Sequence, residues 1–297
     1  MKRLLALAAA ALVLTGCGSQ DPLEANKAQS GQVVIGSADF AESELLMHVY
    51  AEALKTTGAD VQTRPRIGAR EFYVNAVRNG ELTLVPEYTG NLLEFLDPAS
   101  GATESQQVYD QLRGKVGTDM ELLEQSPAED SDVLTVTKAT ADSGLRSMAD
   151  LGPRCRDIVL GAPAEWKSRW EAKIAQDYGC TFKEIRSVEA GTITVNALTS
   201  GEIQAANLFT TSSQITTNDL VKLDDPKNMF PAQNVVPLAG KGKLTPAQAE
   251  AVNKVSRALT TEKLTELNKR LEVDKRLEVD KANPADVAKE FIATAGL

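Results

Sequence analysis

An internal repeat constrains the fold of this 297-residue chain more than any other feature. The segment VNAVRNGE at residues 74–81 returns as VNALTSGE at residues 195–202, an offset of 121 residues. A second correspondence, Ile35 with Leu160, lies at the neighbouring offset of 125. In both copies of the longer segment a helical pattern ends at a glycine, which can adopt the left-handed conformation of a helix C-terminus. The repeat predicts two related lobes.

Within each copy, short apolar segments alternate with segments of helical spacing. This alternation predicts βαβ units, and hence an α/β lobe with a mainly parallel sheet flanked by helices. In the first copy the pattern predicts strands over residues 33–36, 61–67 and 82–88, with helices over Glu42–Thr57 and Ala69–Asn79. In the second copy it predicts strands over residues 157–162, 180–188 and 203–209, with helices over residues 163–178 and 190–200.

The first residues predict export from the cytoplasm. Basic residues at positions 2 and 3 precede an apolar run from Leu4 to Leu14, which is too short to span a bilayer. The run ends in LTGC, which resembles a bacterial lipobox, so we expect residues 1–16 to be a signal peptide and Cys17 to be lipidated. A plain signal peptide with a coincidental cysteine is the alternative. Residues 17–31 are expected to form a lipidated tether between anchor and domain.

Charge and composition exclude several classes of function. Lys and Arg number 32 against 41 Asp and Glu, and removal of residues 1–16 would change the formal charge from −9 to −11, so nucleic acid is not an expected partner. The single histidine, His48, lies in an apolar run and is expected to be packed or on the surface. No metal-ligand spacing and no cofactor fingerprint is present, so no cofactor is expected. Cys155 and Cys180 form an even pair in an oxidising compartment, which favours a disulfide between them.

The repeat also indicates where a ligand would bind. Ligands of open parallel sheets bind outside the carboxyl ends of the strands, so the site is expected between the lobes. At the offset of 121, Tyr88 corresponds to Phe209, Thr89 to Thr210, and position 90 to Thr211. The chain has only 14 aromatic residues, and Phe40 and Trp166 also follow the first strand of each copy. Four aromatic rings are therefore candidates for one cleft, the alternative being that they are ordinary core residues.

Two further strand patterns, Asp132–Thr137 and Asn234–Ala239, are expected to lead from one lobe to the other, so that the lobes can close over a ligand. The predicted boundaries are lobe I at residues 32–131 and 239–297, lobe II at residues 137–234, and a hinge at residues 132–136 and 235–238.

The C-terminal part of the chain has a helical pattern over residues 244–271, which is expected to pack on the first lobe, with Thr245 and Pro246 as cap and first-turn residues. Residues 269–280 are a tandem repeat, KRLEVDKRLEVD. A period of six matches no coiled coil. A tolerated surface duplication is favoured over a docking element.

Five segments carry a resemblance to a known family: GSADFAESELL (36–46), NGELTLVPEYTGNLL (79–93), DLGPRCRDIVLGAPAEW (150–166), AGTITVNALTSGEIQAANLFTT (190–211) and FPAQNVVPL (230–238). The chain resembles the osmoprotectant-binding proteins of ABC importers, the glycine betaine, carnitine and choline group. The resemblance runs from Val33 to the C-terminus.

The resemblance implies a two-lobed periplasmic-binding-protein fold of type II, with a discontinuous first lobe. It also implies a quaternary ammonium solute held in an aromatic cage, an ABC permease as partner, no enzymatic activity, and a monomer anchored by lipid at the outer face of the cytoplasmic membrane. Tyr88 matches the cage tyrosine of the PEYTG element. Phe209 lies at the end of the corresponding second-lobe strand, and Thr210 and Thr211 lie in the motif that follows.

The candidate ligand-binding residues are Asp39, Phe40, Arg70, Tyr88, Thr89, Asp132, Trp166, Arg169, Asn207, Phe209, Thr210 and Thr211. Asp132 stands near the crossing strand, where many members of the family have an aromatic residue. A carboxylate there could pair directly with a cation, or it could indicate a neutral polyhydroxylated or aromatic ligand. Arg70 and Arg169 are candidate partners for an anionic group or are solvated surface charges. An enzyme on the same scaffold is a further alternative, which the absence of a nucleophile and base pair disfavours.

Overall fold

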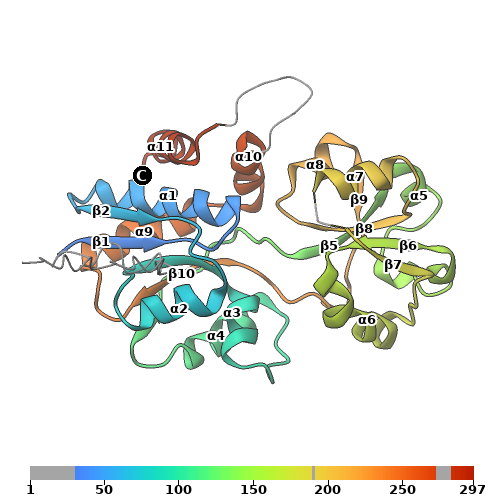
Figure 1. The fold of residues 1–297 in the computed structure, drawn as a ribbon, viewed down its shortest axis with the longest axis horizontal. Helices are drawn as coiled ribbons and strands as arrows, with labels where there is room; N and C mark the ends of the chain where they lie inside the picture. Colours follow the sequence, from blue (N-terminus) through green and yellow to red (C-terminus); the bar gives the residue numbers. More distant parts are fainter. Residues whose placement is uncertain (1–30, 189–190, 272–281) are drawn as a thin grey trace, which may run out of the picture.

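The computed structural model describes residues 31–188, 191–271 and 282–297, which form two lobes lying side by side (Figure 1). The expected signal peptide, Cys17 and all of the tether except residue 31 lie outside the described residues. So do residues 272–280 of the tandem repeat. Among the described residues, no helix has the length and apolar character needed to cross a membrane.

The first lobe contains a sheet of five strands in the order β2-β1-β3-β10-β4. The strands are β1 (Val33–Gly36), β2 (Val61–Arg64), β3 (Leu84–Tyr88), β4 (Met120–Leu122) and β10 (Val235–Gly240). Its helices are α1 (Ala41–Lys55), α2 (Arg70–Arg78), α3 (Thr89–Leu96), α4 (Ser105–Lys115), α9 (Pro246–Ala258), α10 (Thr261–Leu271) and α11 (Pro284–Ala295).

Alternating side chains of β1 divide the first lobe into two cores. Val33 and Ile35 pack with α1, α9, α10 and α11 on one face of the sheet, and Val34 packs with α2, α3 and α4 on the other (Figure 1). Successive residues of a strand point to opposite faces, so a continuous apolar strand such as β1 requires cover on both.

The second lobe contains a sheet of five strands in the order β7-β6-β8-β5-β9. The strands are β5 (Asp132–Thr137), β6 (Val159–Ala162), β7 (Glu184–Ser187), β8 (Ala205–Phe209) and β9 (Leu220–Lys222). Its helices are α5 (Lys138–Asp142), α6 (Ala164–Tyr178), α7 (Thr192–Thr199) and α8 (Ser213–Thr217), with 3-10 turns at Met148–Asp150 and Cys155–Asp157. Cys155 and Cys180 are joined by a disulfide, with 5.4 Å between their Cα atoms.

The order of strands repeats between the lobes. Strand β8 lies 121 residues after β3, and Ile35 and Leu160 pair with the corresponding residues Leu84 and Ala205. In each sheet the three strands of the βαβ units are parallel. The fourth strand, β10 in the first lobe and β5 in the second, runs antiparallel to its neighbours. Each sheet is therefore mixed, and the predicted two-lobed fold is confirmed.

The helical pattern over residues 244–271 forms two helices. The chain forms α9 and α10 with a break between them, because Leu259 is fully buried in an extended conformation (φ −84°, ψ 117°). The hydroxyl of Thr260 then accepts the N–H of Lys263 at 3.3 Å in the first turn of α10. Helix α9 packs on α1 as expected, whereas α10 also contacts α8 of the second lobe (Figure 1).

Strands β5 and β10 are present at the expected places, and each hydrogen-bonds within a single sheet. The expected hinge ranges, 132–136 and 235–238, therefore lie inside the sheets. The chain passes between the lobes just before these strands, at residues 128–131 and 230–234. The two passing segments pair with each other through the N–H of Asp130 and the carbonyl of Gln233, at 3.1 Å.

Candidate functional site

A cavity of about 560 Å³ lies between the lobes, which is within the usual size range for small-molecule sites. Residues of both lobes line it, together with one residue from each passing segment, Asp130 and Gln233. Its lining residues are Phe40, Ala41, Glu42, Arg70, Tyr88, Asn91, Asp130, Asp132, Pro163, Glu165, Trp166, Arg169, Trp170, Gly191, Leu208, Phe209, Thr211, Ser212, Gln233, Asn268 and Leu271.

Five aromatic rings line this cavity. In the first lobe Phe40 precedes α1 and Tyr88 ends β3, with their ring centroids 5.9 Å apart. In the second lobe α6 supplies Trp166 and Trp170, and Phe209 ends β8. Rings from both lobes thus face one space, as the duplicated strand ends predicted.

The two tryptophans are held by contacts inside the second lobe. The indole N–H of Trp166 donates to Oδ1 of Asn207 at 3.1 Å, and the ring of Trp170 meets Phe230 edge-on at 5.3 Å between centroids. Both indoles are buried. Their orientation is therefore set by the core of the lobe.

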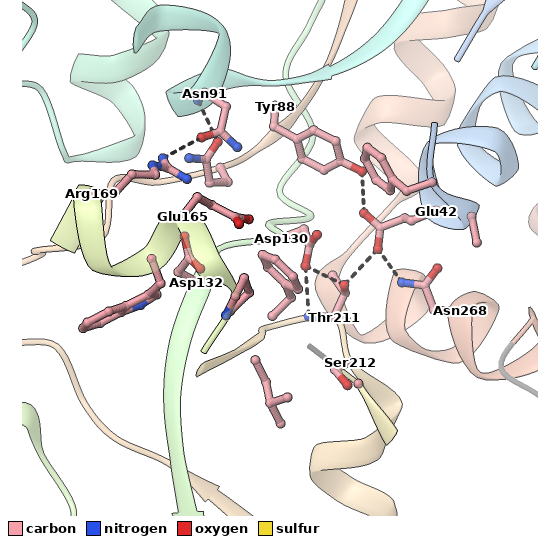
Figure 2. Close-up of a pocket in the computed structure, with 18 of the residues that line it drawn as sticks. Glu42, Tyr88, Asn91, Asp130, Asp132, Glu165, Arg169, Thr211, Ser212 and Asn268 are labelled. Carbon is pink, nitrogen blue, oxygen red and sulfur yellow. Dashed lines mark hydrogen bonds between the residues drawn. The ribbon is translucent and has the colours of Figure 1, made fainter. Parts of the chain in front are cut away.

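The cavity is lined by four carboxyl groups, those of Glu42, Asp130, Asp132 and Glu165 (Figure 2). Its two arginines already have carboxylate partners. Because the arginines are paired in this way, the cavity has an excess of acidic groups, which favours a cationic ligand.

Arg70 forms a paired contact with Glu87, from Nε to Oε1 at 2.7 Å and from Nη2 to Oε2 at 3.2 Å. Arg169 contacts Oδ1 of Asn91 at 3.2 Å (Figure 2). It also contacts Glu94 at 3.0 Å, and its guanidinium lies 4.7 Å from the ring centroid of Trp170. The contacts of Arg169 join α6 of the second lobe to α3 of the first.

Glu42 is the centre of a buried polar network that joins the lobes (Figure 2). Its carboxylate accepts the hydroxyl of Tyr88 at 2.6 Å, the amide of Asn268, and the hydroxyl of Thr211 at 2.8 Å. The pKa of Tyr88 is raised well above its ordinary value, by burial first and then by Glu42, so Tyr88 remains a neutral donor.

Two aspartates extend this polar surface. Oδ1 of Asp130 lies 2.6 Å from the hydroxyl of Thr211, and Oδ1 of Asp132 accepts the amide of Asn207 at 2.8 Å. Burial raises the pKa of both carboxyl groups, and for Asp130 the nearby Glu42 adds to the rise.

The structure brings most of the candidate residues together. Those that line the cavity are Phe40, Arg70, Tyr88, Asp132, Trp166, Arg169, Phe209 and Thr211. Asn207 lies behind the lining residues and forms hydrogen bonds with two of them, Trp166 and Asp132, which orient their side chains. Asp39, Thr89 and Thr210 lie outside the lining.

The last three have other contacts. Asp39 is exposed and lies 3.5 Å from Arg66. The hydroxyl of Thr89 accepts the N–H of Asn234 at 3.0 Å, and that of Thr210 accepts the N–H of Ser131 at 3.0 Å. These two threonines, equivalent in the repeat, hold the passing segments where the chain enters each lobe.

Several lining residues were not among the candidates. Trp170 could have been found, because it follows Trp166 by four residues on the helix predicted over residues 163–178. Glu42 could have been found because it begins the helix predicted directly after Phe40. Asp130 and Asn268 carry no such signal, since their segments meet the cavity only when the lobes are in place. Among the described residues, no cluster of three His, Cys, Asp or Glu could hold a metal ion.

Residues 31–294 match the family described as the substrate-binding domain of ABC-type glycine betaine transport systems. The chain belongs to this family. It is 27% identical over 283 residues to the glycine betaine-binding protein YehZ of Escherichia coli K12, covering 89% of this chain and 91% of that protein. It is 24% identical to the carnitine transport binding protein OpuCC of Listeria monocytogenes, covering 87% of this chain and 85% of the relative.

The fold is also that of solved relatives. A crystal structure of a glycine betaine/carnitine/choline ABC transporter protein superposes with a TM-score of 0.79 at 21% identity, covering 89% of this chain and 99% of the other. Family membership makes the chain an extracytoplasmic substrate-binding component of an ABC importer and not an enzyme. The resemblance drawn from the sequence is confirmed.

Proposed function

We propose that this protein captures a quaternary ammonium solute of the betaine type in the cavity between its lobes and delivers it to a membrane permease. The observation that carries the proposal is the lining itself, where five aromatic rings and four carboxyl groups surround one space. A methylated ammonium cannot donate an N–H hydrogen bond, and ring faces attract it by about 2 kcal/mol or more per desolvated contact. Carboxylates add direct attraction for the same charge.

The rim contains groups that suit a carboxylate on the solute. Arg169 and Asn91 lie at the junction of α6 and α3, where a zwitterionic solute would place its negative end beside the guanidinium. Because Arg169 already contacts Glu94, the acidic excess remains the stronger feature of the cavity. The ammonium group is therefore the part of the solute expected to determine affinity.

Contacts between the lobes support closure over the solute. Thr211 of the second lobe donates to Glu42 of the first, and Arg169 pairs with Glu94 across the same gap. We propose that residues 128–131 and 230–234 form the hinge, because these are the segments in which the described part of the chain passes from one sheet to the other. A solute that contacts both lobes stabilises the closed form by its greater affinity for that form.

The N-terminal segment belongs to the same proposal. Residues 1–16 would direct export, Cys17 would carry the lipid, and residues 17–31 would tether a monomer to the outer face of the membrane. Mass spectrometry of the protein purified from membranes tests the anchor. A lipid mass on Cys17 supports it, and an unmodified Cys17 contradicts it.

The test of the binding proposal uses the chain from residue 18 in calorimetry and thermal unfolding. We expect glycine betaine, choline or carnitine to bind and stabilise, by about 2.7 kcal/mol at 100 times Kd. Phe209→Ala should weaken binding, since Phe209 lines the cavity and is 38% exposed. Phe72→Ala is the matched control, because Phe72 is 58% exposed and outside the lining.

Two results would contradict the proposal. One is a response to sugars or phenolic compounds with none to any quaternary amine. The other is an equal loss of affinity in Phe209→Ala and Phe72→Ala, which would separate binding from the cavity.

A further inference from the structure

The hydroxyl of Thr211 lies between the carboxyl groups of Glu42 and Asp130, and these two contacts need one more hydrogen than the hydroxyl alone provides. The hydroxyl of Thr211 lies 2.8 Å from Oε2 of Glu42 and 2.6 Å from Oδ1 of Asp130. A threonine hydroxyl has one hydrogen, so it can donate to only one of the two. If both carboxyl groups were ionised, the second contact would place two oxygen lone pairs against each other. The geometry therefore requires a proton on one carboxyl group.

The neighbouring donors identify which group holds this proton. Glu42 also accepts the hydroxyl of Tyr88 and the amide of Asn268, and donors of this kind stabilise the ionised form. The further donor to Asp130 among the described residues is the backbone N–H of Thr211, at 3.4 Å. A protonated Asp130 donates to Thr211, and Thr211 donates to Glu42. Each of these two contacts then has one donor and one acceptor.

The charges that face Asp130 act in the same direction. Glu42 reaches it from α1 and Asp132 from β5, while Glu165 of α6 lines the same cavity. The cavity's cations, Arg70 and Arg169, are paired with Glu87 and Glu94. Tyr88 of β3 and Asn268 of α10 are neutral. Burial and Glu42 accordingly hold the pKa of Asp130 well above its ordinary value.

We propose that Asp130 holds a proton in the ligand-free protein and releases it to solvent when a cationic headgroup enters the cavity. A cation beside Asp130 supplies the positive charge that the proton supplied before, so the ionised carboxylate becomes the stable form. This inference rests on the proposed function and extends it, because it makes capture of the solute proton-coupled. The released proton links Asp130 to Thr211. After its loss the hydroxyl of Thr211 can donate to Glu42 or to Asp130 but not to both, so the contact between Glu42 of the first lobe and Thr211 of the second also changes.

The coupling has a definite sign. The bound protein holds fewer protons than the free protein, so affinity rises with pH, by up to about tenfold per pH unit while Asp130 is protonated in the free state. Above the pKa of Asp130 in the free protein, affinity no longer depends on this group. A solute with no cationic headgroup should show no such rise.

Infrared spectroscopy tests the proton without any ligand. The protein from residue 18 should show the carbonyl stretching band of a protonated carboxylic acid near neutral pH, and Asp130→Asn should lose intensity in that band. Asp97→Asn is the matched control, because Asp97 lies outside the cavity and is paired with Lys115 at 2.9 Å. A wild-type spectrum identical in this band to that of Asp130→Asn would overturn the proposal.

Calorimetry with choline tests the coupling. In phosphate and Tris buffers of different ionisation enthalpy, the wild type should release about one proton per choline bound. Asp130→Asn should release none, and Glu42→Gln should release fewer than the wild type, because loss of the Glu42 charge lets Asp130 ionise in the free protein. Asp97→Asn should behave as the wild type.

Failure of this proposal and failure of the proposed function give different results. Choline binding with the same heat in both buffers overturns the proton coupling and leaves the function intact. Absence of binding by any quaternary amine contradicts the function and the coupling together, while the infrared band still decides the proton on Asp130.

Discussion

Tyr88 and Phe209 occupy the same place in the two copies of the repeat, yet the structure holds them differently. Each ends the third strand of its copy, β3 or β8, and pairs with the strand that arrives from the other lobe, Tyr88 with Val235 and Phe209 with Asp132. Tyr88 is 5% exposed and bonded to Glu42, whereas Phe209 is 38% exposed. The repeat thus sets the backbone, and the side chains give one lobe a fixed ring and the other a ring with room to adjust to a solute.

The preceding residues show the same contrast. Glu87 is fully buried and paired with Arg70, while its counterpart in the second lobe is Leu208, buried among apolar side chains. One backbone position is stabilised by an ion pair in the first copy and by hydrophobic burial in the second. Buried ion pairs add little net stability compared with apolar residues of similar size, but they are costly to break.

Breaking this ion pair should have the largest effect. Arg70→Met leaves Glu87 buried without its partner, and we expect the free energy of unfolding to fall by about 3–5 kcal/mol in urea denaturation. The double variant Arg70→Met/Glu87→Leu makes the first lobe resemble the second and should recover most of that loss. A double variant as unstable as the single one would show that an apolar residue cannot replace Glu87 in the first lobe as Leu208 does in the second.

The disulfide is a second difference between the lobes. The described cysteines, Cys155 and Cys180, are both buried in the second lobe and are 25 residues apart. Replacing both with serine should cost about 3 kcal/mol of stability. Hydrogen exchange followed by mass spectrometry should locate the loss in the second lobe. Equal loss of protection in both lobes would contradict the expectation that the disulfide stabilises mainly the second lobe.

Two corresponding glycines test the likeness of the lobes. A Cβ at Gly36 would lie 2.6 Å from Leu82, and one at Gly161 would lie 2.5 Å from Ile203, which corresponds to Leu82 in the repeat. Gly36→Ala and Gly161→Ala should therefore each cost about 2 kcal/mol through overpacking.

Gly114→Ala provides the control for this pair, because Gly114 lies in α4 with open space around it. That substitution should leave stability unchanged or raise it by up to about 1 kcal/mol. Urea denaturation of all three variants makes the comparison. Costs for Gly36 and Gly161 that differ by several-fold would argue against equivalent packing.

Exchanging the ring types should have the smallest effect. Tyr88→Phe removes one donor from buried Glu42 and should cost about 1 kcal/mol of stability. Phe209→Tyr adds a hydroxyl to an exposed ring and should be close to neutral. Thermal unfolding measures both. A larger cost in Phe209→Tyr than in Tyr88→Phe would reverse the assignment of fixed and adjustable rings.

The repeat explains how much of the fold could be predicted. Because the two copies share strand register, an offset of 121 residues in the sequence is enough to relate Tyr88 to Phe209. Local patterns do not reveal contacts between segments that meet only in the assembled protein. Asp130 and Asn268 join the site through such contacts, from a passing segment and from a helix near the C-terminus. The break before α10 was missed for a related reason, since tertiary burial of Leu259 overrides a helical pattern.

The titration of intrinsic fluorescence with choline or glycine betaine tests the central claim most directly. The chain has two tryptophans, Trp166 and Trp170, and both line the cavity between the lobes. Binding of a quaternary ammonium against these rings predicts a saturable change in emission that Phe209→Ala shifts to higher solute concentration and Phe72→Ala does not. Binding detected by calorimetry with unchanged tryptophan emission would place the solute elsewhere and contradict the account.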